Sequence, residues 1–151
     1  MIELKIGDPA PKFSAPDQDG VPVSLDQLKG KKIVLYFYPK DNTPGCTAEA
    51  CDLRDNYELF MKRGYEILGV SPDSQESHRK FIKKHALPFR LLSDVDKNIL
   101  EAYNAWGEKK LAGRKYMGVL RKTYIISEDG KIEDIIDKVN TKAHTKQIFE
   151  A

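Results

Sequence analysis

The sequence is poor in cysteine, and this scarcity excludes one class of protein. Only two cysteines occur among 151 residues. Small secreted domains that depend on disulfides carry many more, so a disulfide-stapled scaffold is excluded. In a reducing compartment a close cysteine pair instead indicates redox chemistry or metal binding. Cys46 and Cys51 form such a pair.

Long hydrophobic runs are absent as well. No apolar stretch approaches the ~20 residues that a membrane-spanning helix needs. The first residues, from Met1 to Lys5, lack the basic and then apolar pattern of a secretory signal. We therefore expect a cytoplasmic protein that has no membrane as a partner.

Neither sign of charge is in large excess, since 25 basic residues stand against 23 acidic ones. The lysines are scattered among acidic residues instead of clustering, which argues against a nucleic-acid partner. A hydrophobic content of 40% and a charged content of 32% are typical of a globular chain. No repeat or linker divides the sequence, so we expect a single domain over residues 1–151.

The sequence does contain an alternation of strand and helix patterns. Residues 33–38 are a continuous apolar run, typical of a buried strand that Pro39 ends. Extended segments are also expected beside a turn at 17–20 and at residues 65–70, 89–92, 119–126 and 132–136. Helices are expected from Pro44 towards Gly64, from Asp73 to His85, from Asp94 to Tyr103, and weakly after Thr141. Residues 104–118 are expected to form a polar loop.

This order of elements predicts an α/β protein with a thioredoxin-like, three-layer fold. Strands that alternate with helices give a parallel core, and a terminal hairpin near Gly130 adds antiparallel strands, so the central sheet is mixed. The short extended segments around the turn at 17–20 predict an added N-terminal β-hairpin.

The segment after the first long strand carries the residues suited to chemistry. In an open α/β sheet, ligands bind beyond the carboxyl ends of the strands, where residues 39–46 lie. Thr43 suits the N-cap of the next helix and Pro44 suits its first position, which places Cys46 in the first turn. A helix N-terminus lowers the pKa of a cysteine. Cys46 is therefore predicted to be a nucleophilic thiolate beside the Thr43 hydroxyl.

Cys51 places a second thiol near this nucleophile. A sulfenic acid condenses readily with a neighbouring thiol, which predicts that Cys46 attacks and Cys51 resolves. Two inert, buried cysteines are the alternative, and the position at a helix N-terminus disfavours it. Zinc binding with His78, His85 and His144 is disfavoured because the spacing fits no zinc motif. These histidines are expected on solvent-facing sides of helices.

The residues around Cys46 resemble the active-site signature of the peroxiredoxins. The matching pattern is Pro39-x-x-x-Thr43-x-x-Cys46, preceded by Tyr36-Phe37-Tyr38 and followed by Thr47-x-Glu49. The Cys46-x4-Cys51 spacing is similar to that of the bacterioferritin comigratory protein group, also called the peroxiredoxin Q type. The resemblance extends from Gly7 to the hairpin near Gly130.

The resemblance implies an atypical 2-Cys peroxidase that reduces hydrogen peroxide and organic hydroperoxides. Cys46 would become a sulfenic acid and then form an intramolecular disulfide with Cys51. Thioredoxin or a similar dithiol would reduce this disulfide, and neither a metal nor another cofactor would be needed. A monomer is also implied.

The resemblance also assigns the residues around the thiolate. Thr43 would hydrogen-bond the thiolate and the peroxide, and Pro39 would shield the pocket. Arg121 would lie beside the thiolate, although periodicity alone does not select it over other basic residues. The backbone N–H groups of Gly45 and Cys46 would face the peroxide.

Two other functions are compatible with a thioredoxin-like fold. A thiol–disulfide oxidoreductase favours a C-x-x-C pair, which this sequence lacks. A non-catalytic interaction module, such as a holdase, needs no reactive thiol. Only a peroxidase would turn over peroxide.

The spacing of the two cysteines carries a structural expectation. In a continuous helix, Cα atoms five residues apart are separated by about 8.6 Å, whereas a disulfide needs them within ~7 Å. We therefore expect the reduced protein to have its helix formed from Pro44, and oxidation to unwind at least the first turn.

Overall fold

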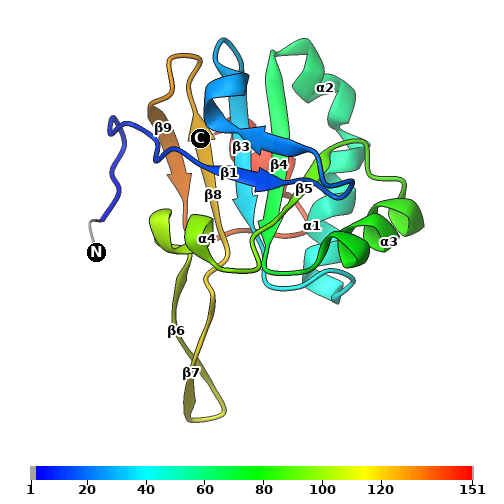
Figure 1. Ribbon diagram of the computed structural model, residues 1–151, viewed down its shortest axis with the longest axis vertical. Helices are drawn as coiled ribbons and strands as arrows, with labels where there is room; N and C mark the ends of the chain where they lie inside the picture. The colour runs from blue at the N-terminus through cyan, green and yellow to red at the C-terminus, as the bar shows by residue number, and fades with distance from the viewer. Residues whose placement is uncertain (1–2, 151) are drawn as a thin grey trace.

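The computed structural model describes residues 3–150 and is built around a five-stranded sheet (Figure 1). The strands are β1 (Ser14–Pro16), β2 (Pro22–Ser24), β3 (Lys32–Phe37), β4 (Tyr65–Ser71), β5 (Arg90–Ser93), β6 (Trp106–Leu111), β7 (Arg114–Val119), β8 (Lys122–Ile126) and β9 (Ile132–Ile136). The helices are η1 (Leu25–Leu28), α1 (Pro44–Asp55), α2 (Tyr57–Lys62), α3 (Gln75–His85), α4 (Asn98–Ala102) and α5 (His144–Glu150).

The central sheet is mixed, as the sequence predicts. Its strand order is β5-β4-β3-β8-β9. Strands β3, β4 and β5 run parallel, while β8 is antiparallel to both β3 and β9. The N-terminal hairpin of β1 and β2 is a separate two-stranded sheet. The predicted thioredoxin-like fold with its added N-terminal hairpin is therefore confirmed.

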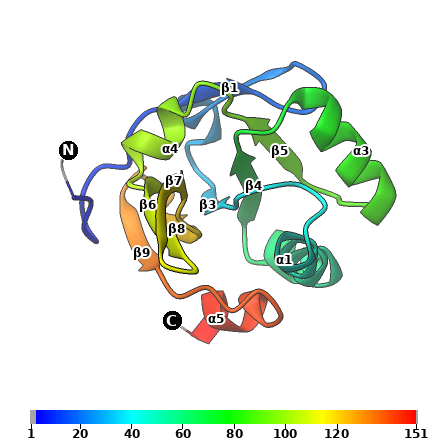
Figure 2. The ribbon, with the colours of Figure 1, turned by 90° about the horizontal axis from the view of Figure 1, so that it is seen from below.

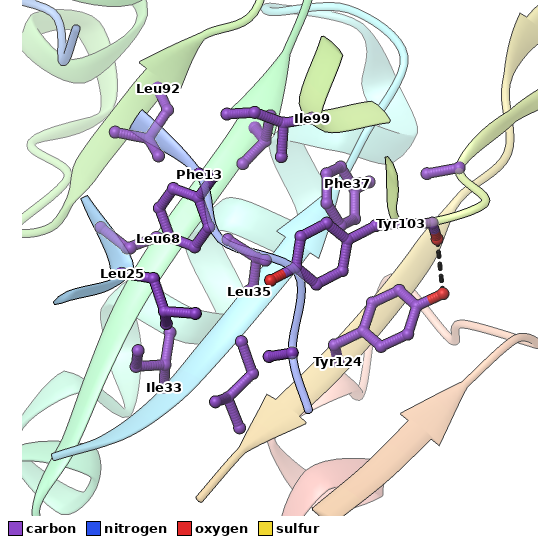
Figure 3. Close-up of a cluster of buried hydrophobic side chains, with 14 of the residues drawn as sticks. Phe13, Leu25, Ile33, Leu35, Phe37, Leu68, Leu92, Ile99, Tyr103 and Tyr124 are labelled. Atoms are coloured by element: carbon purple, nitrogen blue, oxygen red, sulfur yellow. Dashed lines mark hydrogen bonds between the residues drawn. The ribbon is translucent and has the colours of Figure 1, made fainter. Parts of the chain in front are cut away.

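Alternate side chains of β3 enter two different hydrophobic clusters, one on each face of the sheet. Ile33, Leu35 and Phe37 pack with the N-terminal segments and α4, and Figure 3 shows this cluster, in which the Tyr124 hydroxyl donates to the Tyr103 carbonyl oxygen. The opposite face of β3 packs against residues of α1, α2, α3 and α5. Figure 2 shows the resulting layers, with α1 and α5 on the side of the sheet opposite to β1 and α4.

The helix expected from Asp94 to Tyr103 spans only Asn98–Ala102, although the Asp94 carboxylate accepts from the N–H groups of Ile99 and Leu100 near its start.

Two more predicted helices begin or end elsewhere in the structure. The helix expected to run from Pro44 towards Gly64 is divided at Asn56, whose φ of −110° and ψ of 13° are not helical. The helix expected from Asp73 has Ser74 as its N-cap, and the Ser74 side chain accepts a hydrogen bond from the Ser77 N–H group. The Asp73 carboxylate is already used by Ser71 and by the Asp41 N–H group.

The expected polar loop at residues 104–118 was wrong, because strands β6 and β7 form a hairpin there. Ala112 and Gly113 connect the strands with φ values of 51° and 79°, which suit a two-residue hairpin turn. The strand expected at 119–126 is interrupted, since β7 ends at Val119 and β8 begins at Lys122. Arg121 lies in this break. No helix within residues 3–150 has the length and apolar character needed to cross a membrane.

Candidate active site

Cys46 lies in the first turn of α1, at the carboxyl end of β3. Thr43 is the N-cap with an extended backbone, and Pro44 is the first helical residue, as predicted. Cys46 is only 1% exposed, while Cys51 is half-buried, and both thiols are free. Helix α1 runs unbroken through both residues. The expectation that the reduced protein has its helix formed from Pro44 is thus confirmed.

Arg121 joins Cys46 to a buried carboxylate. Its Nη2 atom donates to Cys46 Sγ over 3.2 Å, and its Nη1 atom donates to Glu49 Oε1 over 2.7 Å. Burial lowers the pKa of Arg121, but the negative charges of Glu49 and Cys46 raise that pKa above its ordinary value. A permanent positive charge therefore lies against the sulfur.

Glu49 lies on the same face of α1 as Cys46, one helical turn further along. Its side chain is fully buried. Burial raises the pKa of Glu49 to about 7, the positive charge of Arg121 opposes this rise, and Asp52 adds to it. Its second oxygen, Oε2, has no hydrogen-bond partner within residues 3–150.

Thr43 and Gly45 lie at the start of α1 and Pro39 follows β3, but Thr43 has a different partner from the one expected. The Thr43 hydroxyl, expected to bond to the thiolate, donates to the Lys40 carbonyl oxygen over 2.8 Å. Pro39 and Thr43 are both half-buried. A Cβ atom on Gly45 would lie 3.4 Å from Arg121 Nη2, so the guanidinium approaches the helix backbone closely there.

Two of the three histidines are buried, which contradicts their expected position in solvent. His78 and His144 are both 0% exposed, and His85 is half-buried. His144 Nε2 lies 2.7 Å from Thr123 Oγ1 and 3.5 Å from Glu49 Oε2. The pKa of His144 is lowered, chiefly by burial.

His78 belongs to a hydrogen-bonded network that holds the loop before α1. The buried Asp41 carboxylate lies 2.7 Å from His78 Nδ1 and accepts from the Tyr38 hydroxyl over 2.6 Å and from Ser77 over 2.8 Å. His78 Nε2 in turn lies 3.0 Å from the Leu92 carbonyl oxygen. The network thus fastens the loop before α1 to α3 and β5.

Asp41, Asp73 and His78 lie close enough together to offer ligands to a metal ion. The same atoms are used within the network, since His78 Nδ1 faces Asp41 and the Asp73 carboxylate accepts from the Asp41 N–H group. Hydrogen bonding therefore accounts for this cluster.

Glu49, His144 and Asp41 were not selected as functional residues from the sequence. Glu49 carried a usable signal, because its carboxylate interrupts the apolar helix face of Cys46, Ala50 and Leu53. A charge on a buried face needs a partner, and this requirement points to a site. His144 and Asp41 carried no such local signal.

The chain is similar to known proteins over most of its length. A family model described as "AhpC/TSA family" matches residues 6–135. Peroxiredoxin Bcp of Escherichia coli (strain K12) is 47% identical over 144 residues, which cover 95% of this chain and 92% of that protein. Peroxiredoxin Bcp of Bacillus subtilis (strain 168) is 47% identical over 149 residues, which cover 99% of this chain and 95% of that protein.

A solved structure of bacterioferritin comigratory protein from Xanthomonas campestris has the same fold. It superimposes with a TM-score of 0.86 at 34% identity, covering 91% of this chain and 88% of that one. It belongs to a set of trapped-intermediate and ligand complexes described for their bearing on alkyl peroxide reduction.

Proposed function

The chain belongs to the AhpC/TSA family and is a thiol-dependent peroxidase, and we propose that Cys46 is the residue that attacks the peroxide. The Cys46 sulfur donates an electron pair to one peroxide oxygen, and the O–O bond breaks. Cys46 becomes a sulfenic acid, and the other oxygen leaves with the bonding electrons and takes up a proton to give an alcohol or water. The observation that carries this proposal is the 3.2 Å contact between Arg121 Nη2 and Cys46 Sγ at a helix N-terminus.

Fixed hydrogen-bond donors lower the barrier of this step by stabilising charge on the leaving oxygen. Arg121 supplies N–H groups on a permanent charge, and the N–H groups of Gly45 and Cys46 lie in the first turn of α1. The Thr43 hydroxyl exchanges its bond to Lys40 for one to the peroxide. Pro39, half-buried after β3, shields the pocket from water.

Cys51 then resolves the sulfenic acid. Its sulfur attacks Cys46 Sγ, the S–O bond breaks, and the hydroxyl group leaves as water with the proton of the Cys51 thiol. The unbroken helix α1 keeps the two Cα atoms about 8.6 Å apart, so the first turn has to unwind before the disulfide can close.

A thioredoxin-like dithiol returns the disulfide to two thiols, with hydrogen peroxide and organic hydroperoxides as the substrates. We propose a reducing, cytoplasmic location, because the chain has only two cysteines among 151 residues. Residues from both ends of the chain, such as Ala10 and Ile132, share one core cluster, which supports a single domain over residues 1–151. We also propose that the protein acts as a monomer, because both cysteines of the proposed disulfide lie on one chain.

Replacing Cys46 with serine tests the assignment of the nucleophile. We expect Cys46→Ser to lose peroxide consumption with a dithiol donor, because an alcohol is not ionised at neutral pH. Peroxide loss is followed in the presence of thioredoxin and its reductase. Residual turnover above roughly a tenth of the wild-type rate, a difference of ~1.4 kcal/mol in barrier, would falsify the role of Cys46.

Replacing Cys51 with serine tests the resolving step. Cys51→Ser should react with the first equivalent of peroxide but fail to turn over with a donor that reduces only disulfides. Mass spectrometry should then show Cys46 as a sulfenic acid or a higher oxide. Catalytic turnover that persists with the same donor would assign resolution to another group.

A further inference from the structure

The buried carboxylate of Glu49 is hydrogen-bonded at only one of its two oxygens among the described residues. Glu49 Oε1 is bound by Arg121, but Oε2 is buried and lacks a hydrogen bond among the described residues. A buried carboxylate oxygen left in this way is costly. The polar atom that faces it is His144 Nε2, at 3.5 Å.

The surroundings of His144 determine which of its ring nitrogens carries hydrogen. Gln147 Oε1 accepts from the Asn140 N–H group, and Gln147 Nε2 donates to the Lys138 carbonyl oxygen, so the amide orientation is fixed. His144 Nδ1 lies 2.9 Å from Gln147 Oε1 and therefore donates to it. In the neutral ring, Nε2 is then an acceptor. An ionised Glu49 and a neutral His144 thus face each other with acceptors only.

One added proton removes this conflict. It can lie on Glu49, which then faces the ring as a neutral carboxyl group, or on His144 Nε2, whose positive charge then faces Glu49 Oε2 across 3.5 Å. Either arrangement removes the repulsion between an ionised carboxylate and the lone pair of the ring. Thr123 Oγ1 of β8, 2.7 Å from Nε2, donates its hydroxyl hydrogen to the neutral ring and accepts from the protonated one, so it serves both states.

We propose that Glu49 and His144 share one proton while Cys46 is a thiolate, and that they release it when Cys46 is oxidised. The proposal rests on the assigned role of Cys46 as the reacting thiol. Neither Glu49 nor His144 reaches the reacting atoms in this mechanism. They act through Arg121 and are positioning residues.

The charges around Arg121 give the reason for this coupling. With a thiolate at Cys46 and an ionised Glu49, two negative charges flank one positive charge, and a shared proton brings the buried group to neutrality. Once the sulfur is an uncharged sulfenic acid, Arg121 and an ionised Glu49 already balance. Burial penalises net charge, so the affinity for the proton falls on oxidation.

The other titratable groups that face Glu49 do not reverse this balance. Asp52, also on α1, raises the pKa of Glu49, and so favours retention of the proton. Tyr36 of β3 has a pKa well above its ordinary value, chiefly because of burial, and stays neutral. The remaining groups are Cys46, Arg121 and His144, whose charges the proposal already includes.

The first test titrates Glu49 in the reduced wild-type protein and in Cys46→Ser, where a neutral hydroxyl replaces the thiolate. Carbon-13 NMR of the Glu49 carboxyl group gives its pKa without any redox step. We expect the pKa to be lower in Cys46→Ser by at least about one unit, because the negative charge at position 46 is gone. Equal pKa values in the two proteins would overturn the proposal.

Two substitutions on α5 separate the role of the ring from its packing. In His144→Gln, the new side chain can donate to Glu49 Oε2, so the Glu49 pKa should fall below the wild-type value. Thr145→Val is the matched control, since Thr145 is also buried on α5 and contacts Asp52 instead of Glu49. It should leave the Glu49 pKa unchanged. An unchanged Glu49 pKa in His144→Gln would show that His144 does not share the proton with Glu49.

The second test counts protons during oxidation of Cys51→Ser by one equivalent of hydrogen peroxide. Reaction of a thiolate yields hydroxide, which takes up one proton per Cys46. Proton uptake is measured in a weakly buffered indicator solution near the pKa of Glu49. It should be clearly less than one proton per Cys46, because the Glu49–His144 pair supplies part of that proton. In the double variant Cys51→Ser, Glu49→Gln, the uptake should return to one proton per Cys46. Equal uptake with and without Glu49→Gln would contradict the inference, whereas failure of Cys46 to be oxidised would contradict the proposed function itself.

Discussion

Arg121 shows what can be inferred at the scale of the residue. It contacts Cys46 across 75 residues of sequence. Local patterns do not distinguish it from Arg54, which bonds to the His85 carbonyl oxygen, or from Arg114, which is exposed on β7. Only the likeness to peroxiredoxins selected it, because a contact between distant segments leaves no periodic trace in the sequence.

Removing the Arg121 side chain should slow the oxidation of Cys46. Arg121→Ala takes away a donor and a positive charge, so we expect a loss on the order of 10²–10³-fold in the rate of the peroxide step. Arg121→Lys keeps the charge but not the planar fork that reaches both Glu49 and Cys46, and should recover part of the loss. Single-turnover oxidation by hydrogen peroxide measures the rate.

The control for this series is Arg114→Ala, which removes an exposed arginine of the hairpin. It should leave the rate of Cys46 oxidation unchanged. If Arg121→Ala and Arg114→Ala both react at the wild-type rate, the guanidinium of Arg121 has no part in the step.

The two buried histidines were placed wrongly from the sequence. His78 falls on a helix rich in charged residues and His144 on a short helix with weak apolar spacing, and for both a position in solvent is the ordinary expectation. Each is buried because it meets a carboxylate from a distant segment, Asp41 for His78 and Glu49 for His144. The pairing depends on tertiary packing, so sequence spacing could not reveal it.

At the scale of the element, strands and helices that bury a continuous face were predicted well. Strands β3 and β4 are almost wholly apolar, and α1 has its expected cap and first residue. The β6–β7 hairpin was missed because most of its side chains are exposed and polar residues occur on both faces. Without a buried face, no alternation of apolar and polar residues marks a strand.

Oxidation should loosen two helices together. Closing the Cys46–Cys51 bond requires α1 to unwind, and α5 is held to α1 by the Thr145 N–H group, which donates to Asp52 Oδ2 over 2.7 Å. We therefore expect amide exchange to accelerate across residues 43–53 and across 144–150 in the disulfide form. Hydrogen exchange followed by mass spectrometry compares the two redox states.

Strand β4 provides the internal reference, since residues 65–71 lie between β3 and β5 in the central sheet and should exchange at the same rate in both states. Equal protection of residues 43–53 in the reduced and disulfide forms would contradict the unwinding. So would a crystal structure with the disulfide inside an unbroken helix.

At the scale of the whole molecule, Glu49 makes stability depend on pH. Burial raises the pKa of Glu49 from 4.5 to about 7 in the folded protein. The folded state therefore binds this proton more tightly than the unfolded state. The stabilisation is fully present below the unfolded pKa of 4.5 and is lost as the pH rises through about 7. The lowered pKa of His144 acts in the opposite direction, because its contribution is lost as the pH falls.

Glu49→Gln isolates the first of these effects, because the amide does not titrate. Relative to the wild type, its free energy of unfolding should rise between about pH 5 and pH 8 by on the order of 3 kcal/mol, at ~1.4 kcal/mol per pKa unit. Urea denaturation of the reduced proteins at several pH values measures this difference. A difference that stays constant with pH would show that Glu49 titrates alike in the folded and unfolded chains.

The β6–β7 hairpin gives the molecule a place where its chain can be lengthened. Within residues 3–150 the two strands pair only with each other, and Figure 1 shows them extending away from the central sheet. Residues 111–117 are all exposed. Loop tips of this kind tolerate inserted sequence. A peptide tag or a tether to a solid support, introduced between Ala112 and Gly113, would leave the strand pairing of the central sheet and both chain ends untouched.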